Sequence, residues 1–416
     1  MKVLGLVTEY NPFHFGHKYH LEHSKALTGA EYSISIMSGS FVQRGEPSLV
    51  DKWTKAKMAI DNGVDLVIEL PFIFASQSAE LFAYGSLCLL DSLNIVDYIS
   101  FGSELGDLHY LKAIADILVE EPSSYKKSLK EYLNLGNSYP VSRSNAIVDY
   151  YNSLYSNVDT NKLQDVLKNP NNILAIEYLK ALKVLNSSIE PVTIKRIGSA
   201  YGECSLNNKI SSATGIRHAL FSKEISSIKG YVPDNTFHYL IDYINKYNKF
   251  NTLDNYSQTI HYLLNIDTKN ILKDIIDVET GLENRIVNAS SIYKNSLDLV
   301  DEILTKRYTR TRIQRILVHL IMNLTEKNFR ELSHHYPNYI RVLGANDKGI
   351  YLLKNIKEKS NIPIITKFAH YTKYNNPYLD RIINFDKRAT DLFFLGLKGN
   401  IDYMDMDFYT SPYIKN

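Results

Sequence analysis

Three histidines follow the first apolar segment of the chain closely. The run from Thr8 to His20 reads TEYNPFHFGHKYH, so His14, Gly16 and His17 form the pattern H-x-G-H and His20 follows three residues later. A glycine at such a turn lets backbone N–H groups approach a phosphate, and the start of a helix beyond it favours an anion. Two imidazoles beside that glycine can donate to phosphate oxygens as charge builds in a transition state. The alternative is that His17 and His20 only occupy the first helical turn, but this clustering favours a phosphate site.

A second segment combines hydroxyl groups with a cation. It runs from Ile210 to Arg217 and reads ISSATGIR. The Thr214 hydroxyl and Arg217 are suited to donate to phosphate oxygens, whereas a plain helix N-cap is the alternative for Ser and Thr before an apolar helix. Together with the H-x-G-H loop, the segment favours phosphate contact.

The elements that must position these residues alternate in hydrophobic period. Apolar runs alternate with helix-like runs, the former at Val3–Val7, Tyr32–Met37, Val64–Leu70 and Val96–Phe101, the latter near His17–Leu27, Lys52–Asn62 and Gln77–Leu93. Such alternation predicts βαβ crossovers and a parallel sheet. The strand ends would then share one edge, where open α/β sheets bind their ligands. These ends are Thr8, Ser38, Pro71 and Gly102.

The pattern of the remaining residues predicts mostly helices and three further strands. A helical insertion is expected at about 107–168, a further strand at Val192–Arg196, and mostly helices from Phe221 to Leu332. A small β-α-β-like end follows, with strands at Tyr339–Leu343 and Pro363–Thr366 around a helix at Lys348–Lys359. We therefore predict an α/β domain over residues 1–222 and a mainly helical region over 223–416.

The composition excludes a disordered or a fibrous protein. The 416 residues, 44% hydrophobic and 22% charged, are typical of a globular protein of two or three domains. A net charge of +2 means that any basic surface must be local. Cys88 and Cys204 lie too far apart to suggest a disulfide framework, so we expect a reducing cytoplasm. Glu9 interrupts the first apolar run, which indicates a buried strand and not a signal peptide, and no segment predicts a membrane span.

Further motifs resemble those of a known family. They are MSGSFVQRGEP at Met37–Pro47, FGSE at Phe101–Glu104, NPNNILA at Asn169–Ala175 and KRIG at Lys195–Gly198. With the H-x-G-H loop and the Ser/Thr segment, this set resembles the bacterial tRNA(Met) cytidine acetate ligases of the H-x-G-H nucleotidyltransferase superfamily. The resemblance is dense to about residue 220 and thinner beyond. It implies a Rossmann-like nucleotidyltransferase domain.

The resemblance also implies an activity. ATP and acetate would form acetyl-adenylate with release of pyrophosphate, and the acetyl group would pass to N4 of the wobble cytidine of elongator tRNA(Met). His14, His17 and Arg196 are the expected catalytic donors. The expected ATP-binding residues are Val7, Thr8, Glu9, Tyr10, Asn11, Pro12, Phe13, His14, Phe15, Gly16, His17, Lys18, Tyr19, His20, Gly102, Asn171, Arg196, Thr214 and Arg217.

Some positions carry narrower hypotheses. Phe15 stands where many relatives have Asn, so a polar contact would be missing there, although this is the variable position of H-x-G-H. Arg44 and Lys52 are candidates for steering acetate or the triphosphate, against the alternative of ordinary solvated side chains. Glu9 is a candidate for activating the cytosine amine.

The most basic run of the chain lies in the C-terminal half. Its cations are Lys306, Arg307, Arg310, Arg312 and Arg315, with no anion between them. Contacts to tRNA phosphates are one reading, and a solvated helix face that pairs with Asp298, Asp301 and Glu302 is the other.

No metal site is predicted, because no carboxylate or cysteine spacing completes a set around the histidines. Magnesium is expected only as the counter-ion of ATP. Two rival functions stay open: a cofactor-type adenylyltransferase that leaves the nucleotide on its product, and an RNA-binding protein that holds ATP without turnover.

Overall fold

A mostly parallel sheet forms the centre of the molecule, seen here in a computed structural model. The structure describes residues 1–154, 160–196, 211–222, 224–266, 268–398 and 401–415. The strand order is β10-β8-β5-β2-β1-β6-β7, and β9 pairs with β8. The strands span β1 Val3–Thr8, β2 Tyr32–Ser38, β5 Leu66–Leu70, β6 Tyr98–Ser103, β7 Glu190–Lys195, β8 Ile340–Ala345, β9 Ile364–Ile365 and β10 Tyr413–Ile414.

The strand pairing confirms the predicted parallel arrangement. β1 pairs in parallel with β2 and β6, β2 with β5, and β6 with β7. Their carboxyl ends therefore meet at one edge, as the alternating pattern predicts. β1 and β5 are apolar over most of their length because helices cover both faces of the sheet.

Helices bury alternate residues of each strand on opposite faces. Val3, Ile34 and Ile68 belong to one core cluster, while Leu4 and Val67 belong to the other. On the first face lie α4 Ala79–Ser92 and α9 Pro170–Val184; on the second lie α1 Phe15–Thr28 and α2 Lys52–Asp61. The period of two along each strand explains this division.

The predicted β-α-β end is present, but it belongs to the main sheet. β8 and β9 are parallel on either side of α18 Asp347–Lys359, while β8 also pairs antiparallel with β5. The sheet thus draws on both sides of the predicted boundary at residue 222. Local patterns predict a strand but not its partner, so this pairing was not expected.

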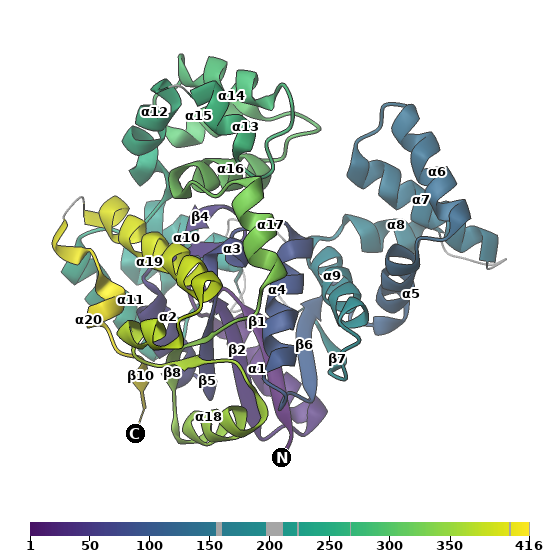
Figure 1. The fold of residues 1–416 in the computed structure, drawn as a ribbon. Helices are drawn as coiled ribbons and strands as arrows, with labels where there is room; N and C mark the ends of the chain where they lie inside the picture. Colours follow the sequence, from purple (N-terminus) through teal and green to yellow (C-terminus); the bar gives the residue numbers. More distant parts are fainter. Residues whose placement is uncertain (155–159, 197–210, 223, 267, 399–400, 416) are drawn as a thin grey trace.

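Two groups of helices extend from the sheet (Figure 1). One stands to the right in that view and comprises α5 Leu108–Glu120, α6 Ser123–Asn134, α7 Tyr139–Leu154 and α8 Thr160–Lys168, where the insertion is predicted. The other lies above the sheet and includes α12 Ser257–Asn265, α13 Thr268–Asp274, α14 Leu282–Ser290, α15 Ser296–Ile303 and α16 Arg310–Met322. The remaining long helices are α10 Ala213–Ser222, α11 Asp234–Tyr247, α17 Glu326–His334 and α19 Pro377–Lys398. No helix among the described residues is both long and apolar enough to cross a membrane.

Candidate active site

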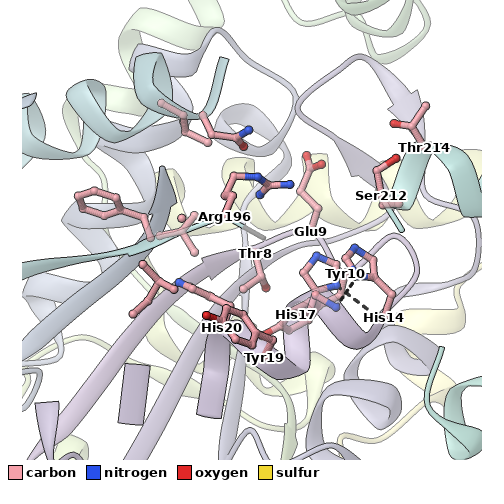
Figure 2. Close-up of a pocket in the computed structure, with 18 of the residues that line it drawn as sticks. Thr8, Glu9, Tyr10, His14, His17, Tyr19, His20, Arg196, Ser212 and Thr214 are labelled. Atoms are coloured by element: carbon pink, nitrogen blue, oxygen red, sulfur yellow. Dashed lines mark hydrogen bonds between the residues drawn. The ribbon is translucent and has the colours of Figure 1, made fainter. Parts of the chain in front are cut away.

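A cavity of about 250 Å³ opens at the carboxyl edge of β1, β6 and β7 (Figure 2). The start of α1, the first turns of α9 and the start of α10 complete its wall. Its lining residues are Val7, Thr8, Glu9, Tyr10, His14, Gly16, His17, Tyr19, His20, Arg44, Phe101, Gly102, Asn171, Leu174, Tyr178, Ile194, Lys195, Arg196, Ser211, Ser212, Ala213, Thr214 and Arg217.

The H-x-G-H residues form the N-terminal cap of α1. The Gly16 N–H donates to His14 Nδ1 at 3.0 Å, and the His14 N–H donates to His17 Nδ1 at 3.3 Å. Because both Nδ1 atoms accept, each neutral ring carries its proton on Nε2. The two rings stack with centroids 3.8 Å apart. The motif therefore presents two oriented N–H donors beside a helix N-terminus, which suits an anion.

Burial and neighbouring cations keep the histidines neutral. Burial, with the charges of Arg196 and Arg217, lowers the pKa of His14 to about 3. Burial also lowers the pKa of His17 well below its ordinary value, and lowers that of His20 to about 4. Arg196 contributes to all three shifts, so its charge acts on the whole histidine cluster. The site is electropositive without histidine protonation.

Arg196 reaches the cavity across Gly102. Its backbone N–H donates to the Ser103 carbonyl at 3.0 Å, which continues the β6–β7 pairing by one residue. A Cβ added at Gly102 would lie 3.2 Å from Arg196 Cγ. Glycine at this position thus allows the arginine to lie close over the end of β6.

The Ser/Thr segment meets the first loop from the opposite side. Arg217 donates from Nη1 to the Asn11 carbonyl at 2.9 Å, and Arg44 donates from Nη1 to Thr214 Oγ1 at 3.3 Å. The Gly215 N–H donates to Ser212 Oγ at 3.0 Å, which is an N-cap contact. The segment therefore caps α10 and also lines the cavity, while its contact with phosphates stays a prediction.

Asn171 is oriented by the loop after β6. Its Nδ2 donates to Glu104 Oε1 at 2.6 Å, and the Asn172 N–H donates to Glu104 Oε2 at 2.8 Å. Asn172 Oδ1 in turn accepts from the Glu104 N–H at 2.9 Å. These reciprocal bonds join the FGSE and NPNNILA motifs into one unit of the wall.

Two buried lysines of α2 support the loop after β2. Lys55 Nζ donates to the carbonyls of Ser38 at 2.7 Å, Gly39 at 2.8 Å and Glu9 at 3.3 Å, tying together the ends of β1 and β2. Burial lowers the pKa of Lys55 to about 8. Lys55 was not among the predicted site residues, because nothing in its local sequence distinguishes it from a solvated helix lysine.

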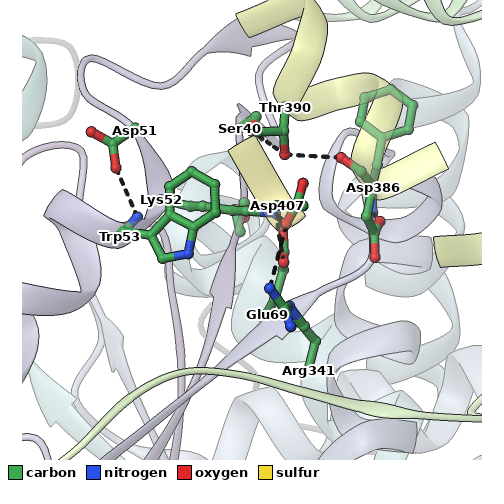
Figure 3. A network of polar contacts seen from close by, with 12 residues as sticks. Ser40, Asp51, Lys52, Trp53, Glu69, Arg341, Asp386, Thr390 and Asp407 are labelled. Atoms are coloured by element: carbon green, nitrogen blue, oxygen red, sulfur yellow. Dashed lines mark hydrogen bonds and ion pairs between the residues drawn. The ribbon is translucent and has the colours of Figure 1, made fainter. Parts of the chain in front are cut away.

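Lys52 lies in a separate buried network and not in the cavity (Figure 3). Its Nζ is 2.9 Å from Glu69 Oε1 and 2.8 Å from Asp407 Oδ1, and Arg341 Nη2 is 3.6 Å from the same Asp407 oxygen. Asp407 belongs to α20 Met406–Tyr409. Lys52 thus holds the C-terminal segment against the sheet and does not reach a ligand in the cavity, contrary to the steering role considered for it.

Most predicted ATP residues line the cavity, and a few do not. Those that do not are Asn11, Pro12, Phe13, Phe15 and Lys18. Phe13 is fully buried in the core, and Asn11 accepts the Leu49 N–H through Oδ1 at 2.7 Å, so these two shape the loop. Of the predicted motifs, Ile197, Gly198 and Ile210 lie outside the described residues, as does Cys204.

Several wall residues were not predicted. Tyr178, Leu174 and Ile194 form an apolar part of the wall, and the Tyr178 ring lies 5.5 Å from that of Phe101. Burial raises the pKa of Tyr178, so its hydroxyl stays protonated. The position of Tyr178 two turns into a helix that starts at the cavity was the available signal.

The basic run is largely ion-paired. Arg310 pairs with Asp301, while Arg307 and Arg312 both pair with Glu279. Arg315 lies 3.8 Å from Asp277 Oδ2, and burial lowers its pKa. The start of α16 also packs on the turn between β3 Phe41–Val42 and β4 Glu46–Pro47, where a Cβ at Gly45 would lie 2.2 Å from the Arg315 backbone nitrogen. Asp301 was a predicted partner; Glu279 and Asp277 were not.

Within the ranges that the structure describes, no group of three His, Cys, Asp or Glu side chains is arranged to hold a metal ion. An H-x-G-H helix cap beside a cationic cavity at a parallel-sheet edge defines a nucleotidyltransferase type of site. In agreement, the family model described as HIGH Nucleotidyl Transferase matches residues 1–407.

Sequence relatives and solved structures identify the family within the nucleotidyl transferases. The chain is 46% identical to the tRNA(Met) cytidine acetate ligase of Thermoanaerobacter sp. (strain X514) over all of both chains, and 42% identical to that of Clostridium perfringens (strain ATCC 13124) over 97% of this chain and 98% of the relative. The crystal structure of Thermotoga maritima TmcAL in its apo form I matches with a TM-score of 0.94 at 32% identity, covering 100% of this chain and 99% of that one. A second crystal form of that protein, bound with alpha-thio ATP, matches with a TM-score of 0.92 at 31% identity and the same coverage. The chain belongs to the tRNA(Met) cytidine acetate ligase family of HIGH nucleotidyl transferases.

Proposed function

We propose that this chain is an ATP-dependent tRNA cytidine acetate ligase. The enzyme activates acetate as acetyl-adenylate with release of pyrophosphate and acetylates N4 of the wobble cytidine of elongator tRNA(Met). The observation that carries the proposal is that His14 Nδ1 and His17 Nδ1 both accept backbone N–H groups at the start of α1, which leaves their Nε2 atoms as donors in the cavity that Arg196 also lines. Full-length similarity to relatives of that name supports the substrate.

The chemistry explains why such donors are needed. Acetate has no good leaving group, and adenylation turns it into a mixed anhydride whose leaving group is AMP. In this proposal, His14, His17 and Arg196, which line one cavity, donate to the α-phosphate and to the departing pyrophosphate as negative charge develops. Arg217 and the Thr214 hydroxyl extend the cradle toward the outer phosphates. Magnesium, where ATP brings it, would be held by the phosphates.

The two predicted regions have separate roles in this proposal. Residues 1–222 supply the ATP site, and residues 223–416 help to bind tRNA through Lys306, Arg307, Arg310, Arg312 and Arg315. The ion pairs of Arg307 and Arg310 do not remove the run from consideration, because these pairs are exposed, and exposed pairs are weak and can exchange for phosphate contacts. The side chains of Arg312 and Arg315 are mostly buried, so this exchange applies to the exposed members of the run.

One incubation tests the function. The protein is mixed with ATP, radiolabelled acetate and bulk tRNA, and both pyrophosphate and label on RNA are followed. Acetate-dependent pyrophosphate with label on tRNA is the expected result. AMP retained on a small-molecule product would indicate a cofactor-type adenylyltransferase, and no pyrophosphate under any condition would indicate a non-catalytic binder.

A substitution of His17 tests the catalytic role that we assign to the histidines. His17→Ala should abolish acetate-dependent pyrophosphate release, because it removes both a donor and part of the helix cap. His23→Ala is the matched control, since His23 lies exposed on the same helix outside the cavity. Equal activity of the two variants would contradict the assigned site.

A further inference from the structure

Acetyl transfer, the second half of the proposed reaction, releases one proton from the attacking amine. Few side chains of the cavity wall are able to accept that proton. The lone pair of cytosine N4 attacks the carbonyl carbon of acetyl-adenylate and forms a C–N bond. The C–O bond to AMP breaks, and its electron pair leaves on the phosphate oxygen. N4 retains one hydrogen in the product, so its other proton passes to a base.

The histidines are poorly suited to accept it. Nδ1 of His14 and Nδ1 of His17 already accept backbone N–H groups, so their Nε2 atoms are donors. The third histidine, His20, has Nε2 3.1 Å from Ser100 Oγ. Burial lowers the pKa of all three, which makes each imidazole a weak base at neutral pH.

The other polar side chains of the wall are no better. Burial raises the pKa of Tyr10 and Tyr178, so neither offers a phenolate. The cationic side chains there are donors: Arg44, Lys195, Arg196 and Arg217. Of the described residues that line the cavity, Glu9 alone carries a carboxylate.

Glu9 is also held in place. Its Oε1 accepts the Gln43 N–H at 2.7 Å, and its backbone carbonyl accepts from Lys55 Nζ at 3.3 Å. Oε2 makes no hydrogen bond within the described part of the chain. Figure 2 shows the carboxylate directed into the cavity on the side where the Arg196 side chain enters. One oxygen thus orients the group and leaves the other for a substrate.

We propose that Glu9 is the catalytic base of acetyl transfer: Oε2 accepts the N4 proton as the amine attacks, and later releases it to solvent after AMP and tRNA leave. The inference rests on the proposed function. It assigns the loop after β1 two tasks in sequence, because the histidines serve adenylation and Glu9 serves the transfer.

The variant Glu9→Gln tests this assignment. A glutamine amide oxygen can still accept the Gln43 N–H, so the loop is retained while the base is lost. Single-turnover acetyl transfer to tRNA should fall on the order of 10²–10⁴-fold, the usual contribution of general base catalysis. Acetate-dependent pyrophosphate exchange should fall far less, so acetyl-adenylate should accumulate on the variant and be recovered after acid quenching.

Matched measurements keep the test decisive. Glu22→Gln makes the same chemical change at an exposed position of α1 outside the cavity and should behave as wild type in both half-reactions. Urea unfolding of Glu9→Gln should match wild type. Transfer at the wild-type rate would overturn the proposal in favour of the AMP phosphate as base, and an equal loss of exchange and transfer would place Glu9 in adenylation. A wild-type protein that forms no acetyl-adenylate would instead refute the proposed function.

Discussion

Lys52 Nζ lies 2.8 Å from Asp407 Oδ1, although the two residues come from opposite ends of the sequence. Both side chains are almost fully buried, with exposed fractions of 1% and 0%. Glu69 contacts the same lysine, and Arg341 approaches the same aspartate. A Cβ at Gly39 would lie 2.3 Å from Glu69 Oε1, so the network directly abuts the loop after β2. The C-terminal segment therefore supports the loop that carries Gln43 and Arg44.

Removing the Asp407 charge should destabilise the protein strongly. Asp407→Asn removes the carboxylate that Arg341 approaches and leaves Lys52 with Glu69 as its remaining carboxylate partner, and breaking a buried pair typically costs about 3–5 kcal/mol. Urea unfolding measures the free energy of unfolding. Asp405→Asn is the control, because Asp405 pairs with Lys387 at a site where its own side chain is half exposed, so the change should cost about 0–1 kcal/mol. Equal losses in the two variants would show that burial of the pair does not matter.

The H-x-G-H cap should make stability depend on pH. The pKa of His14 in the folded chain, about 3, lies below its ordinary value of 6.5, so the unfolded chain binds one more proton between those pH values. The contribution is fully present above pH 6.5 and is lost as pH falls toward 3, at about 1.4 kcal/mol per pH unit for each such histidine.

His14→Asn isolates that contribution, since asparagine is also a good N-cap. In this variant the slope of the unfolding free energy against pH, measured between pH 4 and 6, should decrease by the amount that corresponds to one proton, about 1.4 kcal/mol per pH unit. At pH 8 the comparison reports only the change of cap. Identical slopes for both proteins would contradict a neutral, buried His14.

Gly102→Ala should weaken ATP binding without unfolding the site. The new methyl would lie 3.2 Å from Arg196 Cγ and displace the guanidinium. Weakening a charged hydrogen bond worth about 1.5–3 kcal/mol should raise the KM for ATP on the order of tenfold. Gly136→Ala is the control: it strains a backbone with φ of 81° but meets nothing within 4 Å, so the KM should not change.

Arg310→Ala tests the basic run. The variant should bind tRNA more weakly, and the slope of log affinity against log salt should decrease by about one, while pyrophosphate exchange stays normal. Arg330→Ala removes another exposed, ion-paired helix arginine outside the run and serves as the control. Unchanged tRNA affinity in Arg310→Ala would favour a solvated face, and loss of adenylation would contradict the division of roles between the two regions.

The fold and much of the site could be predicted from local sequence. The alternating apolar runs predict β1, β2, β5 and β6, because buried parallel strands need continuous apolar residues. His14, Gly16 and His17 carry their own geometry, since a helix cap is a contact within one turn. Arg196 and Asn171 came from motifs and lie in the same cavity wall.

What the sequence determined by itself is what depends on neighbours along the chain: the strands, the helices, the histidine cap and the Ser/Thr segment. Only the tertiary structure decided which distant residues meet. It joined β8 to β5, buried Lys52 against Asp407 and placed Lys55 under the carbonyls of two strands. It also paired much of the basic run with Glu279, Asp277 and Asp301. The physical reason is that burial and charge pairing depend on distances in the folded chain, and residue spacing constrains those distances only within a helix turn or a strand.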